Sequence, residues 1–280
     1  MAKQTDHRAF WSNAALTAAA LLVVGTLIVL PLLVVLKEAF AGGARLWWAS
    51  VRDADARSAI WLTVWITAVV VPLNTVFGVA AAWTLARFRF KGRSLLLSLI
   101  DLPFAVSPVI AGLVFILLFG RHGWLGGWLT ERDVQIVFAL PGVLLATLFV
   151  TFPFVARELI PLLTEQGSEE EQAALSLGAS GWQTFWRITV PNMKWGLLYG
   201  IILCNARAMG EFGAVSVVSG HIRGETNTLP LHVEVLYNEY SFTAAFACAS
   251  VLAGLAIVTL VLKSIVEIKS ARDIAKGGGA

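Results

Sequence analysis

Four long stretches of the chain contain no charged residue, and no other feature limits its possible folds as strongly. They are residues 14–36, 58–86, 134–156 and 241–262. Each is longer than the roughly 20 apolar residues that an α-helix needs to cross a bilayer. Two further runs are nearly as apolar: residues 94–120, broken by Asp101, and residues 195–220, broken by Arg207 and Glu211. Together the runs predict six membrane-spanning helices.

The fold class expected from these runs is all-α, an integral membrane helical bundle that forms one transmembrane domain over residues 1–280. Its core is expected in residues 58–266. Charged residues make up 14% of the chain, against about 25% in soluble domains, so no soluble domain is expected. Lys3 and Arg8 precede the first run as in a signal peptide, but the run is longer than such a segment. We interpret it as a retained span.

Basic residues are divided unevenly between the two sets of loops. Thirteen lysines and arginines belong to the termini and to the loops on their side, and seven belong to the other loops. Because loops rich in lysine and arginine stay in the cytoplasm, both termini are predicted to be cytoplasmic. Residues 270–280 end in three glycines and an alanine and are expected to form a disordered tail.

A short polar passage, residues 168–191, separates the fourth and fifth predicted spans on the cytoplasmic side. It reads SEEEQAALSLGASGWQTFWRITVP, and we call it the knob. Ser168 and Glu171 have the spacing of a capping box, so a helix is predicted to begin there. Gly178 then supplies a C-terminal stop, because glycine adopts the left-handed conformation that ends helices.

A second short helix is predicted directly after that glycine. Ser180 and Gln183 have the spacing of a second capping box. Pro191 lacks a backbone N–H and should end this helix. Its apolar face has no evident partner inside the loop, and its residues are Trp182, Phe185 and Trp186. A compact unit of this kind indicates a docking element for another protein, and the alternative is a loop that folds back on its own bundle.

The chain lacks the motifs that would let it supply its own energy or chemistry. Neither a phosphate-binding GxxxxGK[ST] loop nor an HExxH zinc signature occurs. No catalytic, metal or cofactor site is therefore expected, and the driving energy must come from an ion gradient or a partner. Cys204 and Cys248 both fall in predicted spans and are interpreted as small apolar fillers.

The knob also contains Gln172-Ala173-Ala174, then Gly178, then Ile188 with Pro191 at fixed spacing. This pattern resembles the EAA loop of binding-protein-dependent ABC importer permeases: EAA, three residues, glycine, nine residues, I-x-L-P. Gln172 replaces the glutamate and Val190 the leucine, while three acids lie immediately upstream. The resemblance implies docking to an ATPase through Glu171, Gln172, Ala173, Ala174, Gly178, Trp182, Phe185, Ile188 and Pro191.

Three further segments extend the resemblance over nearly the whole chain. They read DLPFAVSP from Asp101, NARAMGEFGA from Asn205 and VVSGHIRGET from Val217. They are similar to the sulfate/thiosulfate permeases of the CysW type, whose fold is the type I ABC importer permease architecture. Molybdate permeases share much of the second segment, so that segment alone does not name the anion.

The resemblance implies a set of partners and a place in the cell. The partners are a second permease of related sequence, two copies of an ATPase that binds ATP and Mg, and a periplasmic sulfate-binding protein. The place is a bacterial inner membrane. Two alternatives stay open: a permease for molybdate or tungstate, and a secondary anion transporter that works alone.

Arg207 and Glu211 are four residues apart and share one face of a predicted span. A charge at mid-bilayer costs roughly 2.5–3.5 kcal/mol on insertion scales, so both are expected to face protein or water. They form either an ion pair that fixes packing, which we favour, or part of the anion path. Asp101 is interpreted as an N-cap where prolines break the third span, and Ser107 as a candidate path residue.

Overall fold

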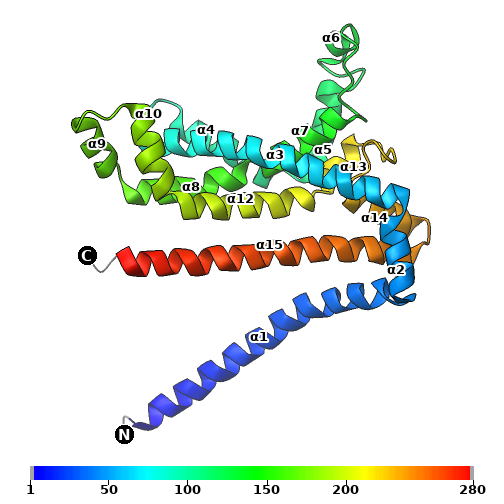
Figure 1. Ribbon diagram of the computed structural model, residues 1–280, viewed down its shortest axis with the longest axis horizontal. Coiled ribbons are helices and arrows are strands. Elements are labelled where there is room, and N and C mark those ends of the chain that lie inside the picture. Colours follow the sequence, from blue (N-terminus) through cyan, green and yellow to red (C-terminus); the bar gives the residue numbers. More distant parts are fainter. Residues whose placement is uncertain (1–2, 278–280) are drawn as a thin grey trace.

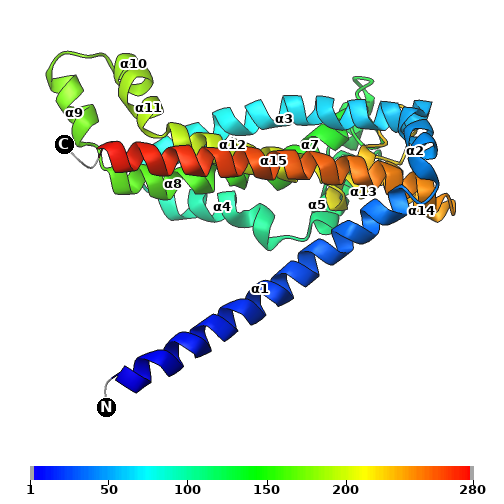
Figure 2. The ribbon, with the colours of Figure 1, turned by 60° about the horizontal axis from the view of Figure 1, so that its bottom comes forward.

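The computed structural model describes residues 3–277, with side chains over residues 15–269, and this part of the chain is helical with no β-strand (Figure 1). The longest helices are α1 (Lys3–Ala39), α3 (Ala54–Arg87) and α15 (Phe242–Gly277). In both views α3 and α15 run along the length of the bundle, whereas α1 diverges from it (Figures 1 and 2). The all-α prediction is confirmed.

The predicted spans correspond to helices, although not all of them are single long rods. Four stretches are long and apolar enough to cross a membrane by length and composition: residues 15–39, 54–87, 140–166 and 242–269. The third predicted span is a pair of helices, α4 (Arg93–Ala105) and α5 (Pro108–Phe119), which bend by 108° at their junction. Counting this pair as one span gives five within the described residues.

The bend corrects the interpretation of Asp101 as an N-cap. Asp101 lies inside α4, and Pro103 is accommodated in the same helix. The break comes at Val106 and Ser107, because the ring of Pro108 excludes the helical conformation for the residue before it. Ser107 is extended accordingly, with φ −57° and ψ 134°. The carboxylate of Asp101 pairs instead with Arg157, at 3.1 Å.

The fourth span lies further along the chain than predicted. It consists of α7 (Leu140–Thr151) and α8 (Pro153–Gln166), so it continues ten residues beyond the predicted end at Ala156. Arg157 lies directly after the predicted end of the span, yet it is nine residues before the end of α8. Its ion pair with Asp101 explains why a charge is tolerated there.

The fifth predicted span, residues 195–220, is divided by a short non-helical segment. Helix α12 (Lys194–Met209) ends before Gly210, and α13 (Gly213–Val218) begins three residues later. The remaining short helices are α2 (Gly43–Arg52), α6 (Gly126–Thr130) and α14 (Leu229–Asn238). Helix α6 stands at the tip of a hairpin that projects sideways from the bundle (Figure 1).

The core lies where α3, α8 and α12 pack together. Leu159, Leu163 and Met193 are fully buried there. Gly78 permits close approach of α3 to α8, since a Cβ added at this position would lie 2.7 Å from Cβ of Val155. Both cysteines are buried and free. Cys204 also donates to the carbonyl of Thr151 at 3.7 Å and accepts from the Asn74 side chain at 3.8 Å.

The knob lies at the end of the bundle where α1 begins and α15 ends (Figures 1 and 2). Helices α2 and α14 lie at the opposite end (Figure 1). The predicted disordered tail, residues 270–280, overlaps the last turns of α15, which continues to Gly277. Alanine and lysine in this segment favour a helix. Residues 278–280 lie outside the described part of the chain.

Candidate functional site

The first helix of the knob, α9 (Glu169–Ser176), begins where predicted but without the predicted capping box. Ser168 makes no side-chain cap, and its Oγ accepts a hydrogen bond from the Gln172 side chain at 2.7 Å. The Glu171 carboxylate is engaged elsewhere, because it binds Arg87 at the end of α3. An arginine is a stronger partner for a carboxylate than a backbone amide, and the tertiary contact replaces the local one.

The glycine turn of the knob is present as predicted. Gly178 has φ +89°, the left-handed conformation, directly after the end of α9. Its N–H donates to the carbonyl of Leu175, and the N–H of Ala179 donates to that of Ala174, both at 3.0 Å. These bonds satisfy carbonyls that the helix end leaves open.

The second capping box is also present. Ser180 Oγ accepts from the Gln183 N–H at 3.3 Å, and the Gln183 side chain accepts from the Ser180 N–H at 2.9 Å. The prediction for Pro191 is wrong. Helix α10 (Gly181–Thr184) continues through a π-helical turn, Phe185–Thr189, into α11 (Val190–Asn192). Pro191 lies in the first turn of α11, where its missing N–H costs little.

An ion pair fastens the knob to the bundle. Arg87 Nε lies 2.8 Å from Glu171 Oε2, and Nη2 donates to Oε1 at 3.1 Å. Thr189 donates to the same carboxylate at 2.7 Å, and Arg87 Nη1 donates to the carbonyl of Leu163 in α8. The two charged side chains are only 9% and 13% exposed. We call the Arg87–Glu171 ion pair the clamp. A cavity of about 270 Å³ adjoins it.

The aromatic face of the knob divides into an anchor and an exposed surface. Phe185 packs edge-on against Trp83 of α3, with ring centroids 5.7 Å apart. Trp182 and Trp186 are 71% and 52% exposed. Leu177, at the end of the first knob helix, is 90% exposed. This residue was not predicted from the sequence, and its position directly before the Gly178 turn is the one feature that indicates its exposure. The knob therefore presents bare apolar surface while being held rigidly.

The EAA-like positions differ in how exposed they are. Gln172 and Ala173 are exposed, and Ala174 is half-buried. Ile188 is half-buried and lines the cavity beside Glu171. The acid that holds the knob is thus the residue immediately before the EAA-like triplet.

The second predicted site, Arg207 with Glu211, forms an ion pair. Arg207 Nη1 lies 2.6 Å from Glu211 Oε2. The Glu211 side chain is 1% exposed, and its Oε1 accepts from the Ala214 N–H at 2.9 Å. Glu211 therefore joins the end of α12 to the start of α13.

The two helix breaks lie next to each other. A Cβ added at Gly213, which opens α13, would lie 2.9 Å from Cβ of Pro108, which opens α5. Ser107 is exposed beside Pro108 and makes no side-chain cap. Non-helical backbone at membrane depth is tolerated only against protein or water, so this junction does not face lipid.

A third charged pair, Asp101 with Arg157, was not predicted. The sequence offered one signal, since Arg157 follows the apolar run directly and Asp101 interrupts another. Both side chains are about half exposed, at 47% for Asp101 and 56% for Arg157.

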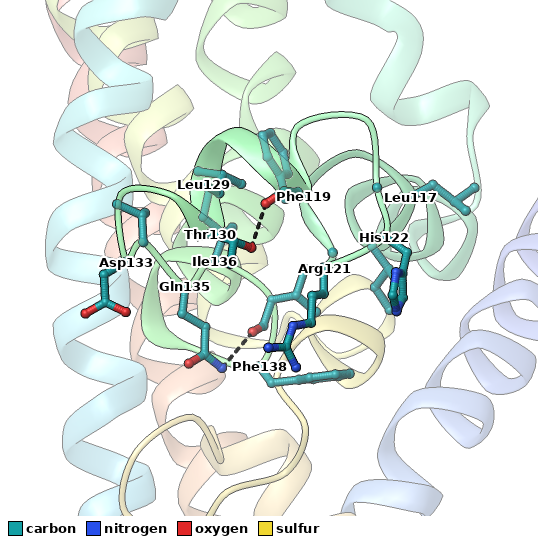
Figure 3. Close-up of a pocket in the computed structure, with 16 residues that line it drawn as sticks. Leu117, Phe119, Arg121, His122, Leu129, Thr130, Asp133, Gln135, Ile136 and Phe138 are labelled. Carbon is teal, nitrogen blue, oxygen red and sulfur yellow. Dashed lines mark hydrogen bonds between the residues drawn. The ribbon is translucent and has the colours of Figure 1, made fainter.

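A cavity of about 690 Å³ lies in the hairpin between α5 and α7 (Figure 3). Its polar lining includes Arg121, His122, Asp133 and Gln135. Gln135 donates to the carbonyl of Val137 at 3.3 Å, which braces one wall. Within the described residues no group of three or more potential metal ligands occurs. This cavity lies outside the helix core and contains none of the predicted site residues.

Residues 74–269 match the family described as binding-protein-dependent transport system inner membrane component. The sulfate transport system permease protein CysW of Synechocystis is 56% identical over 90% of this chain and 91% of its own length. The protein of that name from Escherichia coli K12 is 51% identical over 95% and 91%. The CysT permease protein of the same strain is 36% identical over 89% and 90%.

Solved structures share the fold at low identity. A bacterial ABC transporter involved in the import of the acidic polysaccharide alginate matches with a TM-score of 0.77, at 14% identity, over 97% of this chain and 99% of that one. A bacterial alginate ABC transporter, in complex with its periplasmic protein, matches with a TM-score of 0.74, at 15% identity, over 96% of each. The fold is the type I ABC importer permease architecture.

Proposed function

The chain belongs to the family of binding-protein-dependent transport system inner membrane components, and we propose that it is the permease subunit of an ATP-driven sulfate importer. The observation that carries this proposal is its 56% and 51% identity to two sulfate transport permease proteins over nearly its full length. Because about half of the residues differ between this chain and those relatives, the transported anion could also be thiosulfate. Molybdate and tungstate are more distant alternatives.

In this proposal the knob is where ATP hydrolysis acts on the chain. A separate ATPase subunit binds ATP and Mg, since this chain has no phosphate-binding loop. The exposed side chains of Leu177, Trp182 and Trp186 supply the docking area. The Arg87–Glu171 clamp makes the knob move with α3 and α8. A movement of the ATPase that displaces the knob is therefore transmitted to these membrane-spanning helices.

The remaining parts of the complex follow from the same family. A second permease of related sequence, such as relatives of the CysT type provide, pairs with this chain. Two copies of the ATPase lie on the cytoplasmic side, and a periplasmic binding protein delivers sulfate. Both termini and the knob face the cytoplasm, in agreement with the excess of basic residues on that side.

Reconstitution tests the function directly. The chain is co-purified with its partner permease, ATPase and binding protein and placed in liposomes. We expect uptake of labelled sulfate that requires ATP and the binding protein, together with sulfate-stimulated ATP hydrolysis. Uptake by this chain alone, driven by an ion gradient, would contradict the proposal in favour of a secondary transporter. If molybdate stimulated ATP hydrolysis as strongly as sulfate does, the assignment of sulfate as the transported anion would be wrong.

A further inference from the structure

The charged pair Asp101–Arg157 is about half exposed, although both residues lie within helices of the predicted membrane-spanning region. Asp101 projects from α4 and Arg157 from α8, and Arg157 Nε lies 3.1 Å from Asp101 Oδ1. Within the described residues, the two terminal nitrogens of Arg157 have no hydrogen-bond partner. Because a guanidinium offers five N–H donors in a planar fork, most of its donors remain available.

The pair lies well inside its helices. Asp101 is eight residues from the start of α4, and Arg157 is nine residues from the end of α8. At 1.5 Å per residue both lie about 12–14 Å along the helix from the end where the knob lies. An exposed ion pair at this depth cannot face lipid, since ionisable groups within spans face the bundle interior or a water-filled cavity.

The second intramembrane pair provides a contrast. The Glu211 carboxylate is closed off at 1% exposure and also binds a backbone N–H of α13. That pair is built to join two helices. Neither member of the Asp101–Arg157 pair has a second polar contact with protein among the described residues. Its guanidinium lies 5.2 Å from the ring centroid of Phe104, which packs edge-on against Phe154.

We propose that Arg157 is an anion-contacting residue of the translocation path, with Asp101 as its built-in counter-charge. The ligand class is a tetrahedral oxyanion with two negative charges, which a guanidinium fork binds through paired N–H···O bonds. Asp101 keeps the net charge of the site near zero, so the anion binds weakly enough to leave. The face of α4 and α8 that carries the pair therefore lines water. The choice of oxyanion rests on the proposed function.

Uptake assays separate this role from a purely structural one. The assembled transporter is compared for the wild type, Arg157→Met, Arg157→Lys and the double variant Arg157→Met with Asp101→Asn. We expect all four to co-purify with their partners, and Arg157→Met to lose uptake by about tenfold or more. Lysine should retain part of the activity, and the double variant should stay impaired. Normal uptake by Arg157→Met, or failed assembly rescued by the double variant, would overturn the proposal.

Cysteine labelling tests the path without relying on sulfate. Asp101→Cys and Arg157→Cys are treated, in the assembled complex in membranes, with an anionic, membrane-impermeant methanethiosulfonate, and Leu99→Cys on α4 serves as the matched control. Leu99 is 53% exposed but apolar, and both native cysteines are fully buried. We expect labelling at 101 and 157 but not at 99. No labelling at 101 and 157, with normal labelling after denaturation, would overturn the water-lined face even if sulfate uptake is confirmed.

Discussion

At the scale of single residues, the contact that most affects the knob is the ion pair between Arg87 and Glu171. Both side chains are nearly buried, and the carboxylate accepts hydrogen bonds from the arginine and from Thr189. Removing one member leaves the other charged and unpaired, which typically costs about 3–5 kcal/mol, while removing both is much milder. The pair therefore decides whether the knob follows the bundle or moves independently.

We expect Arg87→Met and Glu171→Gln each to lower the thermal stability of the transporter and its substrate-stimulated ATP hydrolysis. The double variant should regain stability while coupling stays impaired, because the knob remains detached from α3. Glu165→Gln, an exposed acid near the end of α8, is the control and should change neither quantity. Normal coupling in all the variants would contradict the clamp.

Arg207 and Glu211 provide a second test at this scale. If they act only as a pair, Arg207→Met alone or Glu211→Gln alone should reduce the amount of assembled transporter, and the double variant should recover assembly and uptake. Co-purification and labelled uptake measure the two effects. An assembled but inactive double variant would instead place Arg207 in the path, and Arg207→Lys should then keep some uptake.

Gly178 is the residue whose backbone defines the turn of the knob. Its φ of +89° suits glycine and is tolerated by asparagine, but it is strained for β-branched residues. A Cβ at this position meets no atom of this chain within 4 Å, so any strain within the chain comes from the backbone. We expect Gly178→Val to insert normally but to uncouple ATP hydrolysis from uptake, and Gly178→Asn to be nearly normal. Equal activity of the two would argue against the turn.

At the scale of elements, the knob combines a rigid mount with an exposed face. Phe185 packs on Trp83, whereas Trp182, Trp186 and Leu177 face outward. The sequence predicted one docking face that includes Trp182, Phe185 and Trp186. The structure shows that Phe185 instead packs against the bundle and helps to hold the knob in place. Exposed aromatic side chains of this kind supply much of the energy of protein–protein contacts.

Truncating Leu177, Trp182 and Trp186 together to alanine should detach the ATPase while the permease stays folded. A pull-down from detergent extracts measures the ATPase retained. Trp124→Ala is the control, because Trp124 is 90% exposed on the hairpin at the other end of the bundle. Full retention of the ATPase by the triple variant would exclude this face as the docking surface.

At the scale of the whole molecule, the arrangement of the ends constrains the topology. The knob, the start of α1 and the end of α15 lie toward the same end of the long axis, although α1 diverges from the bundle, and α2 and α14 lie at the opposite end (Figure 1). Two glycines mark opposite sides of the proposed membrane, Gly181 in the knob and Gly127 in α6. A Cβ added at either meets nothing within 4 Å, so a cysteine fits at both positions.

In intact cells whose outer membrane is permeable, an impermeant thiol reagent should label Gly127→Cys and leave Gly181→Cys unlabelled. Inverted membrane vesicles should show the reverse. The native cysteines are fully buried and give little background. The opposite labelling pattern would mean that the termini and the knob face the periplasm.

The local features of this chain were readable from its sequence because they depend on neighbouring residues. Uninterrupted apolar runs predicted the helices, the Gly178 turn predicted the end of α9, and Ser180 with Gln183 predicted a cap that is present. The type of fold and the transported class followed from segments that resemble a known family. None of these inferences needed to know which parts of the chain meet in space.

Only the tertiary structure decided which charges pair between residues far apart in the sequence, and where the third span bends. Glu171 was expected to cap its own helix, but Arg87, 84 residues away, takes its carboxylate. Asp101 was expected to cap a break, but it lies within α4 and pairs with Arg157, which therefore stays inside the span. A local pattern sets what a residue can do next to its neighbours, whereas a charge in an apolar surrounding takes the strongest partner that the packed helices bring within reach.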